Sequence, residues 1–544
     1  MIRQASMWGV SLFLGALLTG FGTAANADLP AEEDLREWMD RAIDAGSALA
    51  ASAVVVDDAG ARYVSGGAVA PGGRTPDRAT QFEIGSITKA FTNLLLAELV
   101  ADGHLRYDTT IGEILGEEFQ PRNPAVRDIT LVSLATHRSG LPRLPLNFTP
   151  ADPLDPYAGY GTGQLIDALA ASRERQPLGR HYAYSNFGMG LLGHLLGEVH
   201  GDGYHAALME RVVEPLGLGR TTFEPLDNRA RAFSGGEVVP DWSIDDAMAG
   251  AGALSGTAED FARLARILLG QAPWPLEHER GADFEVVAEG PQGFDVTRVW
   301  HVSRAGDAAI YWHNGGTGGF RSFFGFRPDA KQAIALLVSG DEDPTDNGLE
   351  WLGAQPPERV SQDIDPAILG QYQLTPNVGI GIFEMDGVLV GQLSGQMPLP
   401  LSAVGDDWYA IDVVDASLRF RREDGEVTGL ELAQYGALQT ASRVADTAET
   451  NERNAIELDD ERLDDYVGEY AISDAAKFTI RRGGDGLEAR LTGQPFFPIF
   501  PSGNDVFFYE VVDAELHFER DESGVIDALV LHQGAIEQRA LREP

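Results

Sequence analysis

The sequence predicts a large domain of mixed helices and strands, followed by two small all-β antiparallel barrels. The chain has 544 residues, which at roughly 150 residues per domain suggests three or four folded units. The sequence pattern changes near residue 358. Before this point apolar helical stretches alternate with strand-like runs, and after it short alternating strands are separated by Gly and Asp turns. The second part contains an internal repeat, which divides it into two similar modules.

The repeat has an offset of 98 residues, so that Gly370 and Tyr372 recur as Gly468 and Tyr470. Such self-similarity indicates a duplicated module of about 80 residues. The other matches are Gly395-Gln396 with Gly493-Gln494, Asp415-Ala416 with Asp513-Ala514, Phe420 with Phe518, and, after a one-residue insertion, Gly425, Gln434 and Arg443 with Gly524, Gln533 and Arg542.

The domain boundaries follow from the repeat and from the change in sequence pattern near residue 358. We expect the mixed domain over residues 28–358 and the two barrels over 364–444 and 463–544. The acidic, polar stretches Gly340–Ile364 and Ala445–Arg462 are the expected linkers.

Short strands account for most of the second module. Apolar residues alternate cleanly in Glu515–Glu519, as a strand with one buried face requires. Many short strands with tight turns predict a small antiparallel barrel or sandwich, filled by its own side chains. The expected strands are Lys477–Arg482, Leu487–Gly493, Val506–Glu510, Ala514–Asp521 and Ile526–Gln533, with a hairpin turn at Gly483–Gly486.

The charge balance excludes several classes of partner. The chain carries 83 acidic and 41 basic residues, a net charge of −42, which argues against binding to nucleic acid or to an anionic membrane surface. It contains no cysteine, which rules out disulfides and thiolate metal sites. We expect a small-molecule or peptide substrate, and the sequence says nothing about oligomeric state.

Residues 1–27 have the pattern of a secretory signal peptide. Arg3 provides the positive start, Trp8–Leu18 the apolar centre and Ala25-Asn26-Ala27 a small-residue cleavage site. The apolar run is short for a permanent anchor, although an uncleaved anchor is the alternative. Without twin arginines or a cysteine for lipidation, we expect Sec-type export from a bacterial cell to the periplasm or the medium, with no integral anchor after cleavage.

The first chemical motif is Ser86 followed by Lys89, just before the apolar helix Ala90–Val100. Positions i and i+3 share one face of a helix, so the two side chains point the same way. The hydroxyl at the helix start lies where free N–H groups and the helix dipole stabilise negative charge. Alone, the pair also fits a capping serine beside a solvated lysine.

Two further motifs support this pair. Tyr184 and Asn186, at i and i+2 before a helix that runs to about Val199, can face one cleft as a proton relay and an orienting amide. The strand Ile310–Gly316 contains His313 and ends in Gly315 and Gly316, which permit close approach of a substrate backbone; its partner strands are expected at Arg321–Arg327 and Gln332–Ser339. Taken singly, each motif also fits a structural role.

Together, Ser-x-x-Lys, Tyr-x-Asn and His-x-Gly, separated by 98 and 129 residues, resemble the serine β-lactamase, DD-peptidase and esterase superfamily. The stretches Ile129–Pro142, Glu214–Thr222 and Gly252–Leu269 are also similar to it, so the resemblance covers roughly residues 40–345. It implies an α/β (α+β) β-lactamase/transpeptidase-like domain of the class C type, with a central antiparallel sheet and a helical subdomain. The two trailing barrels resemble the arrangement of D-aminopeptidases in this superfamily.

The resemblance also implies roles for the motif residues. Ser86 would be the acylated nucleophile, Lys89 and Tyr184 would move the proton, and Asn186 would hold Lys89 and contact the substrate carbonyl. His313 and Gly315 would lie on the opposite wall. The N–H groups of Ser86 and Gly316 would form the oxyanion hole.

His313 is a departure from the superfamily, because β-lactamase-type members generally carry Lys there. A free His has a pKa of about 6.5 and a free Tyr one of about 10, so a mostly neutral His313 helps Tyr184 less to ionise. Our hypothesis is that neutral Lys89 is the main base and that Tyr184 passes the proton to the leaving group. The departure also makes efficient β-lactamase activity less favourable than cleavage of esters, D-amino-acid amides or small peptides.

The sequence thus predicts an exported serine hydrolase that forms an acyl-enzyme on an amide, peptide or ester, of D-aminopeptidase, DD-carboxypeptidase or esterase type. The alternatives are a β-lactamase and a non-catalytic binding or sensor protein that retains the fold. An α/β-hydrolase is excluded because the chain has no G-x-S-x-G. The histidines His194, His200 and His205 lack an H-E-x-x-H pattern, so no metal or other cofactor is expected.

Overall fold

The computed structural model describes most of the chain from residue 29 to residue 543. The predicted signal peptide, residues 1–27, lies outside the described residues. The residues that the structure describes are 29–152, 154–172, 182–290, 294–354, 364–375, 378–385, 388–393, 399–405, 407–411, 416–423, 425–434, 437–444, 456, 458, 460–473, 476–483, 486–491, 496–509, 514–521, 523–533 and 536–543.

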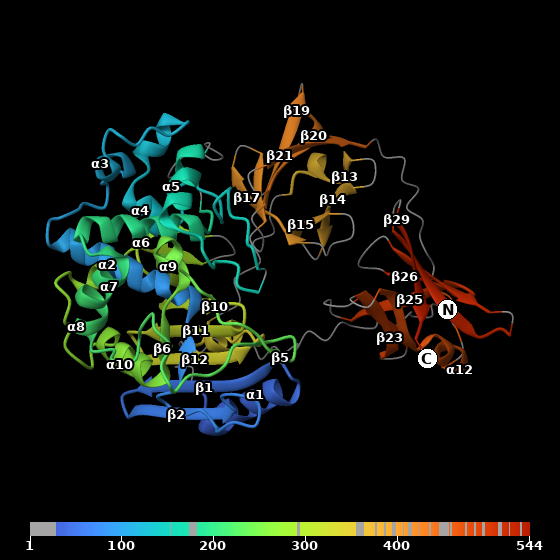
Figure 1. Ribbon diagram of the computed structural model, residues 1–544, viewed down its shortest axis with the longest axis horizontal. Coiled ribbons are helices and arrows are strands. Elements are labelled where there is room, and N and C mark those ends of the chain that lie inside the picture. Colours follow the sequence, from blue (N-terminus) through green and yellow to red (C-terminus); the bar gives the residue numbers. More distant parts are fainter. Residues whose placement is uncertain are drawn as a thin grey trace.

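An eight-stranded antiparallel sheet forms the centre of the first domain, in the order β2-β1-β12-β11-β10-β9-β8-β7 (Figure 1). Residues alternate between its two faces: Val54 and Val56 join one core, and Ala53 and Val55 the other. Its strands are β1 Ala48–Asp57, β2 Gly60–Gly67, β7 Val286–Glu289, β8 Asp295–Thr297, β9 His301–Ala305, β10 Ala308–Gly316, β11 Phe320–Arg327 and β12 Gln332–Gly340.

One face of this sheet is covered by two helices from opposite ends of the domain. Helix α1 (Glu32–Asp44) packs Leu35, Trp38 and Met39 into the same core as Leu352, which follows α11 (Thr345–Trp351). The predicted linker Gly340–Ile364 therefore begins later than expected, because its first part forms α11 on the sheet.

The other face carries the helical subdomain. Helices α2 (Thr88–Ala101) and α6 (Asn186–His200) are buried on most sides, and α9 (Asp246–Gly252) packs closely on α6 because a Cβ at Gly190 would lie 2.8 Å from Ala247 O. The remaining helices are α3 Ile111–Leu115, α4 Leu131–Ala135, α5 Thr162–Ala171, α7 Gly203–Leu208, α8 Glu214–Leu216 and α10 Ala258–Leu268, and the short strands are β3 Gln81–Glu83, β4 Phe233–Ser234, β5 Glu237–Val238 and β6 Ser255–Thr257.

The second part of the chain folds into two all-β domains, as predicted. The later one is a closed barrel of eight strands, and the earlier one is a nine-stranded sheet that stops short of closure. Its edge strands, β16 (Leu399–Pro400) and β17 (Ser402–Gly405), are consecutive in the chain, whereas in the later domain β25 (Phe497–Gly503) spans both equivalent positions. The other strands are β13 Gly370–Thr375, β14 Val378–Met385, β15 Val388–Leu393, β18 Trp408–Ile411, β19 Ala416–Glu423, β20 Glu426–Gln434 and β21 Ala437–Arg443, then β22 Gly468–Ser473, β23 Ala476–Gly483, β24 Gly486–Leu491, β26 Val506–Tyr509, β27 Glu515–Arg520, β28 Ile526–Gln533 and β29 Ile536–Arg542, with helix α12 at Asp460–Leu463.

The two β domains share structural details as well as sequence. The hydroxyl of Tyr372 donates to Ile368 O, and the hydroxyl of Tyr470 donates to Tyr466 O in the same way. Each domain fills its interior with its own apolar side chains. Each also carries an equivalent ion pair, Arg422 with Asp407 in the first and Arg520 with Asp505 in the second.

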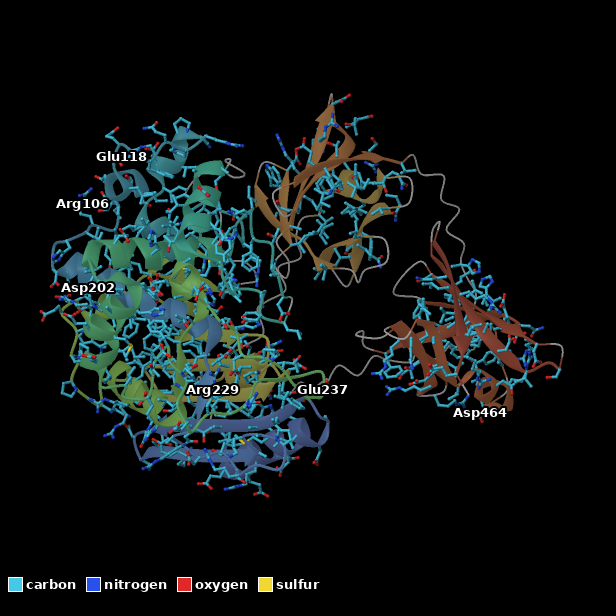
Figure 2. The ribbon with its side chains drawn as sticks, in the orientation of Figure 1. Arg106, Glu118, Asp202, Arg229, Glu237 and Asp464 are labelled. Carbon is cyan, nitrogen blue, oxygen red and sulfur yellow. The ribbon has the colours of Figure 1, made fainter. Side chains whose placement is uncertain are left out.

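Acidic side chains lie on the outer surface of the molecule. Figure 2 labels several of them, including Glu118, Asp202, Glu237 and Asp464, and all four are exposed. None of the described helices is both long enough and apolar enough to span a membrane.

Candidate active site

Ser86 lies in a 3₁₀ turn, Gly85–Ile87, between β3 and α2. Strand β3 is held by pairing with β6, which fixes the turn from one side. On the other side the end of β10 approaches so closely that a Cβ at Gly85 would lie 2.6 Å from Gly316 N. Gly85 also has a φ of 49°, a conformation that favours glycine. The sequence before Ser86 therefore allows two backbone segments to meet at the hydroxyl.

Lys89 is almost fully buried, with 1% of its surface exposed, and its Nζ lies 2.8 Å from Ser86 Oγ. The amine also donates to Ala251 O in α9 at 2.6 Å. Burial, with a smaller contribution from Arg143, lowers the pKa of Lys89 well below its ordinary value. A neutral amine can keep one N–H on Ala251 O and direct its lone pair at the Ser86 hydroxyl. This arrangement suits a general base.

Tyr184 lies close to both Ser86 and Lys89. Desolvation raises its pKa to about 12, although a hydrogen bond with Ser86 acts in the opposite direction. Lys89 Nζ is 4.8 Å from the centre of its ring and Arg143 Cζ is 5.3 Å away. Tyr184 is therefore a protonated phenol at neutral pH, which makes it a proton donor in the resting site.

Asn186 is the first residue of α6, and the Ser185 hydroxyl caps this helix by accepting from Gly188 N. The Asn186 amide Nδ2 donates to the Tyr157 hydroxyl at 3.4 Å, and its Oδ1 is buried with no hydrogen-bond partner. Asn186 thus lines the same pocket as Ser86. The expected grip on Lys89 differs, since Ala251 O is the amine's other partner.

His313 lies on β10 with 3% of its surface exposed, behind the strand end that faces Ser86. Its Nδ1 is 2.6 Å from Asn314 O, and its ring stacks on His301 at 4.7 Å. Burial, together with His301 and Lys89, lowers the pKa of His313 well below its ordinary value. The ring is therefore neutral, as the sequence reasoning assumed for this position.

The motifs did not single out two other histidines near the site. His137 has a φ of 57°, accepts a hydrogen bond from Ser185 N at 3.1 Å, and places its ring 4.4 Å from that of Tyr184. His301 stacks on His313 and lies 3.4 Å from the Tyr182 hydroxyl. His137 falls in the stretch Ile129–Pro142, which the resemblance had marked; His301 has no comparable signal in the sequence.

The backbone of Gly315 and Gly316 passes close to the turn that carries the nucleophile. A Cβ at Gly315 would collide with Ile84 O and would lie 2.9 Å from Ser86 N. The Ser322 hydroxyl, one strand away, donates to Ile84 O at 2.9 Å and helps to hold this contact. Glycine at position 315 is thus required for the strand to pass beside Ser86.

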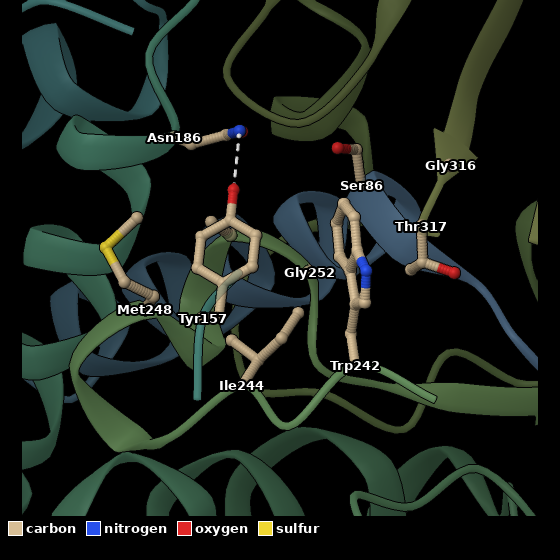
Figure 3. Close-up of a pocket in the computed structure, with 10 residues that line it drawn as sticks. Ser86, Tyr157, Asn186, Trp242, Ile244, Met248, Gly252, Gly316 and Thr317 are labelled. Atoms are coloured by element: carbon tan, nitrogen blue, oxygen red, sulfur yellow. Dashed lines mark hydrogen bonds between the residues drawn. The ribbon is translucent and has the colours of Figure 1, made fainter. Parts of the chain in front are cut away.

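A small pocket opens beside Ser86, with about 30 Å³ available to the centres of water molecules (Figure 3). Ser86 and Gly316 lie side by side in its lining, so an atom bound there is near both residues. The full lining is Ser86, Tyr157, Asn186, Trp242, Ile244, Met248, Ala251, Gly252, Gly316 and Thr317.

Comparisons with known proteins give matches over both parts of the chain. Residues 35–355 match the family model described as Beta-lactamase, and residues 452–542 match a domain of unknown function, DUF3471. The D-alanyl-D-alanine-carboxypeptidase/endopeptidase AmpH of Escherichia coli is 25% identical over 350 residues, which cover 60% of this chain and 90% of AmpH. Unguisins hydrolase ungD' of Aspergillus campestris is 26% identical over 294 residues, which cover 49% of this chain and only 53% of that relative, about half its length.

Among solved structures, a class C β-lactamase superposes with a TM-score of 0.51 at 19% identity, covering 57% of this chain and 92% of that enzyme. At this identity the likeness speaks for the fold of the first domain alone. The family model, by contrast, spans more than half of the sequence and includes all three motifs. The chain belongs to the Beta-lactamase family, within the serine β-lactamase and DD-peptidase superfamily.

Proposed function

We propose that this protein is an exported serine hydrolase that forms a covalent acyl-enzyme through Ser86. The observation that carries the proposal is the 2.8 Å contact between Lys89 Nζ and Ser86 Oγ, made by a lysine whose pKa is lowered by burial well below its ordinary value. A base beside a hydroxyl is the arrangement by which a serine becomes a nucleophile at neutral pH.

In acylation, Lys89 takes the proton from Ser86 Oγ while the oxygen attacks the substrate carbonyl carbon. The carbonyl oxygen becomes negatively charged and accepts hydrogen bonds from the N–H groups of Ser86 and Gly316. Tyr184 then gives its proton to the leaving group and recovers one from the Lys89 ammonium, so the protons balance. Water hydrolyses the acyl-enzyme by the reverse use of the same groups.

The substrate class we propose is an amide, peptide or ester, of D-aminopeptidase, DD-carboxypeptidase or esterase type. The neutral His313 leaves its strand without the cation that would hold a substrate carboxylate, so β-lactam hydrolysis is the second candidate. The relative named as a D-alanyl-D-alanine-carboxypeptidase/endopeptidase supports a peptide bond as one target.

A fluorophosphonate probe tests the nucleophile. We expect the wild type to be labelled at Ser86 and Ser86→Ala to remain unlabelled. Ser172→Ala is the matched control, because Ser172 is a buried serine that donates to Ala168 O away from the pocket. An unlabelled wild type would favour a binding protein instead, and labelling that survives in Ser86→Ala would place the nucleophile elsewhere.

Export is a separate part of the proposal and rests on residues 1–27. We expect the protein secreted by a bacterial host to begin at Asp28, as the Ala25-Asn26-Ala27 site implies. Mass spectrometry of the mature protein measures this directly. A secreted or membrane-bound product that still begins at Met1 would contradict cleavage.

A further inference from the structure

The pocket beside Ser86 is bounded by two loops that meet across it. One loop, described over residues 143–152 and 154–161, brings Tyr157, and the other, residues 239–245, brings Trp242. The two rings lie 5.2 Å apart at 56°, and Ser243 N donates to Asp155 Oδ1 at 2.8 Å. Figure 3 shows Tyr157 and Trp242 on either side of the space in front of Ser86. One aromatic contact and one hydrogen bond thus join the loops.

Trp242 and the residue before it are both held in place. Its indole packs so closely on the backbone of Gly318 that a Cβ there would collide with Trp242 Nε1. Next to it in the chain, Asp241 lies 3.2 Å from Arg229, and Arg229 is paired at 2.5 Å with Glu83, three residues before Ser86. The loop is therefore tied to the nucleophile's own segment, and the indole is a fixed wall.

The opposite loop is equally well supported. Phe148 packs on Tyr157 at 5.0 Å and on Tyr160 at 5.3 Å. The Tyr160 hydroxyl donates to Asn147 Oδ1 at 2.7 Å, and Asn147 donates onward to Gln164 O in α5. Tyr157 cannot swing aside without disturbing this cluster.

The space that remains is small and partly apolar. It offers about 30 Å³ to water centres, and one water needs about 10–15 Å³ on this measure, so two or three non-hydrogen atoms fit. Ile244, Met248 and Ala251 supply apolar surface, and the pocket opens directly on Ser86. An acyl group on Ser86 Oγ can therefore extend into this space.

We infer that the pocket receives the acyl side of the substrate and admits two or three non-hydrogen atoms beyond its carbonyl group, as in propionyl or alanyl. This inference rests on the proposed acyl-enzyme at Ser86. Trp242 is the residue that sets the limit, since it closes the space between Gly318 and Tyr157. Each methylene that the pocket cannot accept costs about 10-fold or more in kcat/KM.

The test is the chain-length dependence of kcat/KM for p-nitrophenyl acetate, propionate, butyrate and hexanoate. In the wild type we expect a fall of about 10-fold or more between propionate and hexanoate. Trp242→Ala should raise the hexanoate-to-acetate ratio by about 10-fold or more. Trp351→Ala, which removes a half-buried tryptophan that contacts Trp38 on the far face of the sheet, is the matched control and should leave the ratio unchanged.

A second variant guards against misfolding of Trp242→Ala. Ile244→Ala enlarges the same pocket without removing the contact between the loops, and it should also raise the hexanoate-to-acetate ratio. A wild-type kcat/KM that stays level or rises with chain length overturns the inference, as does an unchanged ratio in both variants.

The failure of this inference and of the proposed function are separable. If fluorophosphonate labels Ser86 and ester hydrolysis is lost in Ser86→Ala, but the chain-length profile is flat, only the size limit is wrong. If Ser86 is neither labelled nor needed for hydrolysis, the proposed function itself fails.

Discussion

Lys89 Nζ donates a hydrogen bond to the carbonyl oxygen of Ala251, 162 residues later in the chain, at 2.6 Å. This contact draws the amine towards α9 and fixes its distance from Ser86 Oγ. It needs only one N–H, so it holds the lysine equally well in the neutral state that acylation requires.

Lys89→Ala should therefore slow covalent labelling of Ser86 by about 100-fold or more, because a positioned base contributes about 10²–10⁴-fold. In the wild type the labelling rate should rise with pH as Lys89 loses its proton, at a pKa well below that of an ordinary lysine. Lys331→Ala, at an exposed lysine paired with Asp58, is the control and should keep both rate and profile. A Lys89→Ala enzyme that retains most of the rate and the same pH profile would contradict the assignment of Lys89 as the base.

Tyr184→Phe should affect substrates according to their leaving groups. With a pKa of about 12, Tyr184 carries its proton at pH 7 and donates it to the group that departs. An anilide needs that proton and p-nitrophenolate does not, so we expect a loss of about 100-fold on a p-nitroanilide and less than about 10-fold on a p-nitrophenyl ester. Equal losses in kcat on the two substrates would instead indicate that Tyr184 acts before the leaving group departs.

Gly315→Ala should disrupt the nucleophile turn. The new Cβ would collide with Ile84 O and crowd Ser86 N, which should cost about 1–3 kcal/mol of stability and most of the Ser86 labelling. Gly281→Ala is the matched control, because a Cβ at Gly281 meets nothing within 4 Å. Thermal unfolding and labelling measure the two effects, and a Gly315→Ala protein that matches Gly281→Ala in both would show that the close approach is unnecessary.

A buried ion cluster far from the motifs should make stability depend on pH. His278 Nδ1 lies 2.7 Å from Glu98 and its Nε2 lies 3.0 Å from Asp283, and all three are buried. Against the lowering effect of burial, hydrogen bonds to Asp283 and Glu98 raise the pKa of His278 to about 9. The folded state therefore binds this proton more tightly than an unfolded chain, in which the pKa is about 6.5.

The direction of the pH dependence follows from the difference between the folded and unfolded pKa values of His278. The contribution of His278 to stability is complete below about pH 6.5 and is lost as the pH rises through about 9. His278→Gln should lower the free energy of unfolding by about 3–5 kcal/mol at pH 6 and by less at pH 9.5. Denaturant unfolding at the two pH values measures it. A stability difference that grows with pH would contradict the cluster's charge assignment.

The sequence could predict those parts of the site that depend on local spacing. Ser86 and Lys89 share a helical face because i and i+3 always do, and the glycines at the end of β10 marked a close approach. By contrast, the Ala251 carbonyl has no side-chain signature, and neither has the partnership of Asn186 with Tyr157. Contacts between distant backbone atoms require the fold.

The β domains show the same division. Alternation correctly predicted β27, and β28 was also expected, but β25 was missed because Pro498 and Pro501 break the expected pattern. Strands β22 and β29 were also missed. The duplication itself was plain from residue identities, whereas the unclosed edge of the first domain depends on the backbone at Leu401, which the repeat does not reveal.

Because of the interruption at Leu401, the two β domains should differ in where they open first. A barrel that closes by a continuous strand must break a whole ladder of hydrogen bonds before it opens, while a sheet with a seam can loosen there first. Backbone amides of β16 and β17 should then exchange with deuterium sooner than those of β25. The duplication would in that case have produced one module that resists local opening and one that opens more easily.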